Sequence, residues 1–162
     1  MRLALICAAT LAAASVAAAA PPPAGTLVPG RSLGGIRLGE GADAVRAALG
    51  RDYGLCRGCA TTTWYYTYRP FQQRGLAVEL TRGRVSALYT LWQPKGWATK
   101  GGLRLGALDG ELTAATGPLV AVVCPGYDAL VADSGKARTV YYIFRGRVWG
   151  FGLLRPRTNP CR

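Results

Sequence analysis

The sequence contains no histidine, and only eight of its 162 residues are acidic. Without imidazole, Ser-His and Cys-His nucleophilic catalysis are excluded, together with zinc sites that need a histidine ligand. Carboxylate pairs are scarce too, because Glu79 stands alone in an expected strand and Asp128 and Asp133 form the only loose pair. We therefore expect no catalytic residues and no enzyme activity.

Acidic residues are outnumbered by twenty basic ones, which gives the chain a formal net charge of +12. Seventeen of these are arginines and three are lysines. One interpretation is an acidic partner, such as an anionic envelope polymer or a phospholipid surface. The alternative is that a GC-rich genome encodes arginine where others encode lysine. The basic residues are scattered rather than grouped in runs, so we expect no nucleic-acid partner.

Long apolar runs are absent after residue 20. The chain opens with Met1-Arg2 and continues as an uncharged, alanine-rich stretch, which is typical of a cleavable signal peptide over residues 1–20. Three prolines follow at once and break any helix, so we expect no transmembrane segment after cleavage. A Pro-rich flexible arm is predicted over residues 21–32. The mature protein is then secreted or periplasmic.

Five cysteines are present, and Cys7 would be removed with the signal peptide. The four that remain are Cys56, Cys59, Cys124 and Cys161. An even number of cysteines in an exported chain favours disulfides over free thiols. Of the three possible connectivities, we prefer Cys56 with Cys59 and Cys124 with Cys161.

The Cys56-x-x-Cys59 spacing leaves two other interpretations open. An arginine between the two cysteines would stabilise a thiolate, as thiol–disulfide exchange requires. That chemistry places the first cysteine at a helix N-terminus, whereas this pair follows an expected helix and precedes an expected strand. A four-cysteine zinc site would need a second short spacing, which Cys124 and Cys161 do not supply. We therefore expect no metal and no cofactor.

Two blocks of the sequence recur in the same order. Residues 34–39, GGIRLG, are followed by GGLRLG at residues 101–106, and RGRV at residues 82–85 returns at residues 145–148. A duplication of this kind organises a fold before any secondary structure is assigned. We interpret it as two copies of one structural unit.

Each copy combines a short helix with β-prone segments. The first helix is predicted near residues 42–49 and ends at Gly50, which suits a left-handed cap, and the second ends before Gly117. Strands are predicted over residues 61–69, 76–81 and 85–92 in the first copy and over residues 128–132, 139–144 and 148–154 in the second.

These elements define a domain organisation and a fold class. Repeat unit 1 covers residues 33–92, a linker covers residues 93–100, and repeat unit 2 with a C-terminal tail covers residues 101–162. The hairpins turn at Arg82-Gly83 and at Arg145-Gly146. The expected fold class is α+β, in which two tandem helix-plus-antiparallel-hairpin units form a two-layer structure with a largely antiparallel sheet.

The first copy resembles the SmpA/OmlA (BamE-like) unit in three features. These are a Leu-Gly pair at residues 38–39, a short helix that ends in Leu49-Gly50, and a hairpin with a Gly-Arg-Val turn. Two such units in one chain are similar in arrangement to the β-lactamase inhibitory proteins. The resemblance implies a protein-binding module, which is envelope-associated in one case and enzyme-inhibitor-like in the other. The chain departs from both families, because it lacks a lipobox cysteine and its Cys56-x-x-Cys59 spacing does not match a disulfide across a longer loop.

Strand alternation predicts where such a module would bind. In the first copy, Ser86 marks the more polar face of the last strand, and Leu88 and Trp92 share that face. Aligning the copies places aromatic residues of the second copy on the same open face, where they would form an exposed binding patch. The residues predicted to bind a partner protein are Tyr142, Phe144, Trp149, Phe151 and Trp92, with Arg145 and Arg147 at the rim. The alternative is a register error of one residue, which would place the aromatic row in the core.

Overall fold

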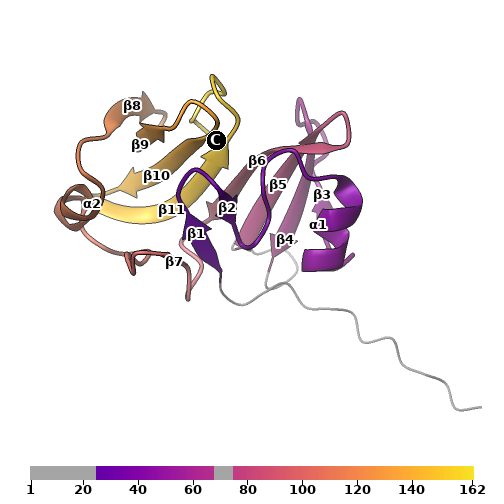
Figure 1. Ribbon diagram of the computed structural model, residues 1–162, viewed down its shortest axis with the longest axis horizontal. Helices are drawn as coiled ribbons and strands as arrows, with labels where there is room; N and C mark the ends of the chain where they lie inside the picture. The colour runs from indigo at the N-terminus through magenta and orange to yellow at the C-terminus, as the bar shows by residue number, and fades with distance from the viewer. Residues whose placement is uncertain (1–24, 68–74) are drawn as a thin grey trace, which may run out of the picture.

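The computed structural model describes residues 25–67 and 75–162 (Figure 1). The predicted signal peptide lies outside the described residues. Within these ranges the chain forms eleven strands and two helices. In chain order they are β1 (Thr26–Val28), β2 (Ser32–Leu33), α1 (Ala42–Leu49), β3 (Gly54–Leu55), β4 (Thr62–Thr67), β5 (Gly75–Thr81), β6 (Arg84–Leu91), β7 (Ala98–Thr99), α2 (Asp109–Thr116), β8 (Val120–Cys124), β9 (Tyr127–Asp133), β10 (Arg138–Phe144) and β11 (Arg147–Leu154).

Eight strands form one antiparallel sheet in the order β3-β4-β5-β6-β11-β10-β9-β8. At its centre, β6 and β11 pair only over Ala87–Tyr89 and Gly152–Leu154. Beyond this short pairing, the backbone N–H of Phe151 donates to the hydroxyl oxygen of Thr90 at 2.8 Å. A side chain therefore replaces a backbone partner at the point where the two central strands separate.

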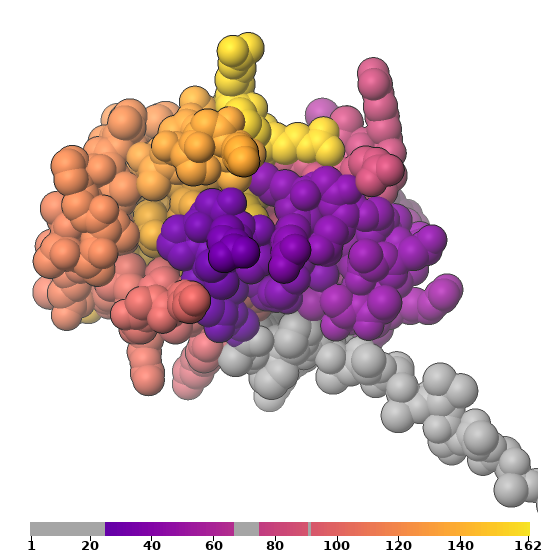
Figure 2. Space-filling view, viewed as in Figure 1, coloured from indigo at the N-terminus to yellow at the C-terminus, as the bar shows by residue number. Residues whose placement is uncertain are grey.

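The remaining strands form a small sheet in which β1 pairs antiparallel with β2 and parallel with β7. In Figure 2 the N-terminal segments, coloured indigo to purple, lie across the front of the molecule. Leu27 and Leu33 from this sheet, with Ile36 and Trp97 beside it, are buried in the core against the large sheet. We call the side of the large sheet that they cover the first face. The described part of the predicted flexible arm thus forms strands, and Trp97 anchors the predicted linker.

The two helices end where the sequence predicts. Gly50 follows α1 with φ 86° and Gly117 follows α2 with φ 75°, in the left-handed region that favours glycine. Val45 and Leu49 of α1 and Leu112 of α2 are buried in the core of the first face. The helix predictions are confirmed.

The predicted fold class is wrong. The described chain is mostly β, and it does not form two helix-plus-hairpin units. Four strands after each helix, where three were predicted, join a single eight-stranded sheet. The strands at Gly54–Leu55 and Val120–Cys124 were not predicted. The first is only two residues long, and the second is an edge strand whose Val120 and Val123 side chains are exposed, so it lacks a buried face that alternation would mark. Two helices of eight residues cannot form a covering layer, and the small sheet covers much of the first face instead.

Both predicted Arg-Gly turns are confirmed, between β5 and β6 and between β10 and β11. Directly after each turn, an arginine side chain donates a hydrogen bond to the loop that precedes the helix of the same repeat. Arg84 Nη1 donates to the carbonyl oxygen of Gly39 at 3.1 Å, and Arg147 Nη1 donates to that of Gly106 at 2.9 Å. Arg147 is therefore engaged with the loop before α2 and does not lie at an aromatic patch.

Candidate functional site

The opposite side of the large sheet, which we call the second face, has its own buried cluster. Tyr65, Tyr127 and Trp149 pack against this cluster at its margin. Its buried members come from both halves of the sheet: Ala77, Ala87, Tyr89, Cys124, Ala129, Val131, Val140, Tyr142 and Leu154.

A β-bulge in β11 decides which side chains reach the second face. Tyr142 of β10 pairs with Gly150 and Ile143 pairs with Val148, so Trp149 has no partner of its own. A bulge of this kind reverses the alternation of the residues that follow it. Trp149 therefore lies on the second face.

Phe151, two residues later, is fully buried in the first-face core next to Tyr141, with the ring centroids 6.0 Å apart. The predicted row of four aromatics on one face must be corrected accordingly. Tyr142, Phe144 and Trp149 lie together on the second face, and Phe151 does not join them.

An equivalent bulge occurs in β6, where Glu79 pairs with Ala87, Leu80 pairs with Val85, and Ser86 is left over. The face assignment predicted for this strand is reversed as a result. Leu88, predicted to share the open face with Ser86, is buried in the first-face core, whereas Tyr89 packs on the second face. Both corrections have the same cause, a single extra residue in each strand.

The second face contains a cleft of about 610 Å³. It lies where β6 and β11 separate and extends to the β8–β9 turn. Seven of its eleven lining residues are aromatic. The lining consists of Tyr65, Tyr89, Thr90, Trp92, Gln93, Gly126, Tyr127, Tyr142, Phe144, Trp149 and Arg162, and we call it the aromatic cleft.

Trp149 lies among three other rings of the aromatic cleft. Its centroid is 5.6 Å from that of Tyr127, 6.0 Å from Tyr142 and 6.2 Å from Trp92. These separations fall within the range in which aromatic pairs attract one another. The cluster joins β9, β10 and β11 to Trp92, which directly follows β6, and gives the cleft a fixed aromatic wall.

Two buried polar atoms of the aromatic cleft have no hydrogen-bond partner, the hydroxyl oxygen of Tyr142 and Nε1 of Trp149. The Tyr142 side chain is 1% exposed, and burial raises the pKa of its hydroxyl far above the usual range, so it stays protonated. Buried polar groups normally have a partner, because leaving one without costs free energy. Trp149 Nε1 can only donate, so a matching group would have to be an acceptor.

The rim of the cleft carries exposed aromatic side chains. Trp92 is 59% exposed and Phe144 is 46% exposed, and the guanidinium carbon of Arg145 lies 5.1 Å from the Phe144 ring centroid. Trp92 and Gln93 have φ values of 54° and 48°, which are unfavourable for residues other than glycine. Consecutive residues in this conformation at the rim of a cleft are a form of backbone strain that tends to occur at functional sites.

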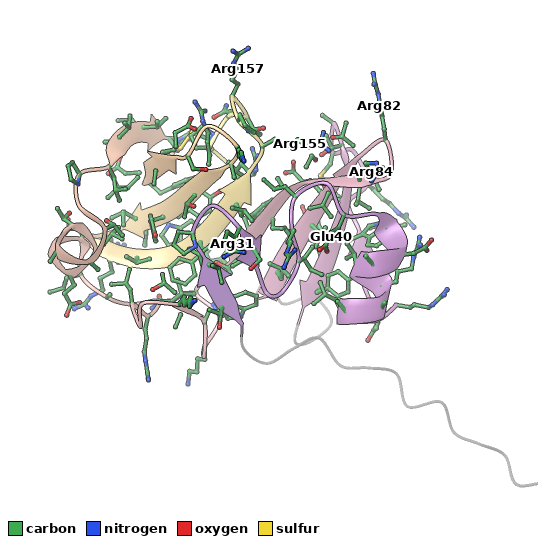
Figure 3. All side chains as sticks on the ribbon, in the orientation of Figure 1. Arg31, Glu40, Arg82, Arg84, Arg155 and Arg157 are labelled. Carbon is green, nitrogen blue, oxygen red and sulfur yellow. A yellow bond between two sulfur atoms is a disulfide. The ribbon has the colours of Figure 1, made fainter. Side chains whose placement is uncertain are left out.

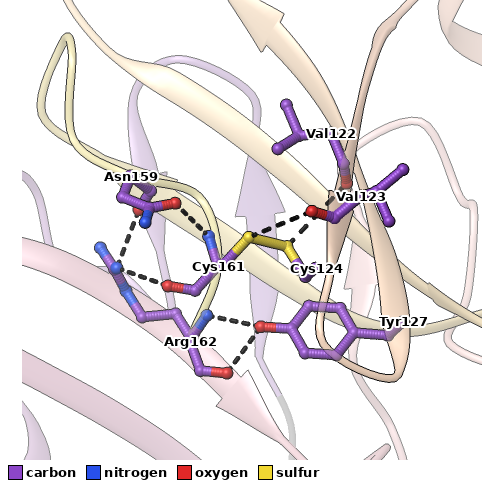
Figure 4. Close-up of a disulfide and its surroundings, with 7 residues drawn as sticks. All are labelled: Val122, Val123, Cys124, Tyr127, Asn159, Cys161 and Arg162. Atoms are coloured by element: carbon purple, nitrogen blue, oxygen red, sulfur yellow. Dashed lines mark hydrogen bonds between the residues drawn. A yellow bond between two sulfur atoms is a disulfide. The ribbon is translucent and has the colours of Figure 1, made fainter.

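The segment that follows β11 contributes Arg162 to the lining of the cleft, and Figure 4 shows how this segment is held. The disulfide between Cys124 and Cys161 joins it to the end of β8. The hydroxyl of Tyr127 donates to the carbonyl oxygen of Arg162 at 2.6 Å and accepts from its backbone N–H at 2.5 Å. These two hydrogen bonds hold Tyr127 and Arg162 next to each other in the lining of the cleft.

The Arg162 side chain reaches from this segment over the floor of the cleft. Its Nε lies 3.3 Å from a carboxylate oxygen of Glu79, and both side chains are about 15% exposed. Its guanidinium carbon lies 5.6 Å from the centroid of the Tyr89 ring. Burial, followed by the nearby Glu79 charge, raises the pKa of Tyr89 well above its usual range. The charged groups at the floor are thus paired with each other.

Seven of the eleven lining residues were not predicted as site residues: Tyr65, Tyr89, Thr90, Gln93, Gly126, Tyr127 and Arg162. A signal for two of them was present in the sequence. Tyr127 follows Cys124 closely and Arg162 follows Cys161 directly, so the predicted disulfide would by itself have brought Tyr127 and Arg162 together. Tyr65 and Tyr89 depend on the bulges and on the sheet order, which no local pattern marks.

Both preferred disulfides are confirmed, Cys56–Cys59 and Cys124–Cys161. They indicate an extracytoplasmic location, because disulfides persist in oxidising compartments. Cys56 directly follows β3, and the next element is strand β4 rather than a helix. In the described ranges, no helix has the length and apolar character to cross a membrane, and no group of three or more potential metal ligands is present.

No protein-family model matches the chain, and no curated protein matches it. Two solved structures have a similar fold. One is a DUF4309 family protein, YjgB, from Bacillus subtilis subsp. subtilis str. 168, with a TM-score of 0.56 and 16% sequence identity over 76% of this chain and 84% of that one. The other is an extracellular protein containing an SCP domain from Bacillus anthracis str. Ames, with a TM-score of 0.52 and 9% identity.

The likeness to the second protein covers 74% of this chain but 44% of that one, so this chain corresponds to less than half of its length. At such low identities, the two comparisons establish a shared fold and nothing about activity.

Proposed function

We propose that this chain is a secreted or periplasmic, non-enzymatic module that binds another protein through the aromatic cleft. The observation that carries the proposal is the cleft itself, in which seven aromatic side chains surround about 610 Å³ of open space. Exposed apolar surface of this kind marks binding sites, and Trp, Tyr and Arg are the residues most enriched at interface hot spots.

The rim favours a protein partner. Trp92 and Phe144 are large, exposed and already held in place, Trp92 by strained backbone and Phe144 beneath Arg145. A partner that inserted apolar side chains between these residues would bury them at little cost in side-chain order.

The test removes the rim without disturbing the core. The full chain would be immobilised as wild type, as the double variant Trp92→Ala/Phe144→Ala, and as the matched control Leu55→Ala/Val123→Ala, which truncates two exposed apolar side chains outside the cleft lining. Each would be exposed to the extracytoplasmic fraction of the native organism. We expect one partner protein to be retained by wild type and control and lost at least tenfold on the cleft variant. Equal retention on all three would refute the proposal.

A second function predicted from the sequence, binding to an anionic polymer or phospholipid surface, is supported by exposed arginines that have no carboxylate partner in the described part of the chain. Salt distinguishes it from cleft binding, because charge-driven retention is lost at moderate ionic strength and apolar contact is not. A third, thiol–disulfide exchange at Cys56–Cys59, would require ready reduction by a mild dithiol. The position of this pair in a strand-to-strand loop gives that chemistry no support.

A further inference from the structure

Arginine occupies turn positions where it is conformationally unfavourable. Arg82, Arg145 and Arg157 have φ values of 53°, 51° and 64°, and they are three of the five residues other than glycine with positive φ in the described ranges. Asparagine and glycine are the residues that suit this conformation, most of all in two-residue hairpin turns. A GC-rich genome can encode glycine at these positions, so base composition alone does not account for arginine there.

Two of these arginines lie at the same end of the large sheet. The backbone N–H of Arg155 donates to the carbonyl oxygen of Ser86 at 3.1 Å, which places the segment after β11 beside the start of β6. Figure 3 shows Arg82 and Arg157 projecting from one edge of the molecule, with Arg155 between them and Arg84 below Arg82. We call these four residues the arginine ridge.

The charge of the arginine ridge is not neutralised locally. Among the described residues, the ion pairs involve Arg46, Arg138 and Arg162, and no ridge arginine forms one. Arg84 donates to a backbone carbonyl oxygen, which leaves its positive charge in place. Three of the four ridge arginines, Arg82, Arg84 and Arg157, are exposed, so their guanidinium groups are open to a large anion.

From this arrangement we infer that the arginine ridge binds a linear, phosphate-bearing polymer, independently of the aromatic cleft. Guanidinium groups bind phosphate through two parallel hydrogen bonds, and a row of them matches repeated phosphates along a chain. A bilayer is the less suitable partner. Membrane-surface sites combine basic residues with apolar side chains that enter the lipid, and the exposed large apolar residues of the described chain all lie on other segments.

The experiment uses inorganic polyphosphate as the probe and the full chain as wild type, Arg82→Asn/Arg157→Asn and Arg145→Asn. Arg145 is the matched control, because it occupies the same kind of Arg-Gly turn with the same backbone conformation at the opposite end of the sheet. Asparagine suits positive φ, so each variant is expected to keep or raise the melting temperature. Fluorescence anisotropy would measure the dissociation constant between 50 and 200 mM NaCl.

We expect the ridge variant to bind polyphosphate about tenfold more weakly than wild type at the lower salt concentration, and its salt dependence to become shallower. Arg145→Asn and the cleft variant Trp92→Ala/Phe144→Ala should both retain the wild-type dissociation constant. If Arg145→Asn weakened binding as much per charge removed as the ridge variant does, only net charge would matter, and the inference would be overturned. Tighter binding to phosphatidylglycerol vesicles than to polyphosphate, lost in the same ridge variant, would overturn the choice of polymer in favour of a membrane.

Discussion

A Cβ atom at Gly152 would lie 2.8 Å from the hydroxyl oxygen of Tyr142 and 3.2 Å from the Cζ atom of its ring. A Cβ atom at Gly150 would lie 3.0 Å from the same ring. The Tyr142 side chain thus lies flat along β11, over two positions that have no side chain. This contact lets a fully buried ring form part of the cleft.

We predict that Gly152→Ala destabilises the fold by about 1 to 3 kcal/mol, the usual cost of overpacking a buried site. The new Cβ would also lie 3.2 Å from the Cβ atom of Val140. Both Tyr142 and Val140 are buried, so neither side chain can move away without disturbing the cluster. Urea denaturation would measure the change. The control is Gly110→Ala in α2, where the new Cβ meets no atom within 4 Å. There we expect no loss, or a gain of up to about 1 kcal/mol from helix propensity.

The hydroxyl of Tyr142 can be removed at little cost, because it has no partner to lose. We predict that Tyr142→Phe leaves the free energy of unfolding unchanged or raises it by about 1 kcal/mol. Tyr127→Phe provides the contrast, since its hydroxyl makes two hydrogen bonds to the backbone of Arg162. Its loss should cost about 1 to 3 kcal/mol. If the two variants lost the same stability, the Tyr142 hydroxyl would have to be hydrogen-bonded in solution.

The local elements of this fold were predictable from the sequence, and its sheet faces were not. Both helices, both Arg-Gly turns and both disulfides follow from glycine caps, turn composition and cysteine spacing, all of which act within a few residues or along one loop. The eight-stranded order depends instead on how β6 meets β11, a contact between distant segments that leaves no periodic signal.

The residues of the candidate site were only partly predictable for the same reason, because they depend on which face of the sheet each side chain occupies. Strict alternation placed Phe151 with Trp149, and one extra residue in β11 separated them. The bulge falls at Trp149, directly before Gly150. A glycine within a predicted strand is a sign of a bulge, which strict alternation does not take into account. The aromatic composition of the hairpin therefore identified the region of the cleft correctly. Which of these side chains line the cleft depends on the pairing register of β10 and β11, which alternation alone does not reveal.

The two disulfides should contribute unequally to stability. Cys124 and Cys161 are 37 residues apart, whereas Cys56 and Cys59 are separated by three. Closing a longer loop removes more entropy from the unfolded chain, so we predict a loss of about 4 kcal/mol for Cys124→Ala/Cys161→Ala and about 2 kcal/mol for Cys56→Ala/Cys59→Ala. Chemical denaturation of the two double variants would measure both losses. Equal losses would show that chain entropy does not govern them.

Alkaline pH should weaken the fold before it changes the charge of the buried tyrosines. Burial raises the pKa of Tyr66 from 10.0 to about 12, and burial also raises the pKa values of Tyr89 and Tyr142. Between pH 10 and 12 the unfolded chain therefore releases protons that the folded chain retains, so stability is complete below pH 10 and decreases as the pH rises. Each such tyrosine contributes a slope of up to about 1.4 kcal/mol per pH unit.

Tyr66→Phe tests this relation, because it removes one of these tyrosines from the first-face core. The variant loses the hydrogen bond from the Tyr66 hydroxyl to the carbonyl oxygen of Gly50, so it should be less stable at pH 8 by about 1 kcal/mol. Between pH 10 and 12, however, its stability should decrease less steeply than that of wild type, and the two curves should converge. Urea denaturation at pH 8, 10 and 11, with phenolate absorbance recorded in parallel, would measure both effects. Parallel curves over the whole range would mean that Tyr66 titrates at the same pH in the folded and unfolded chains.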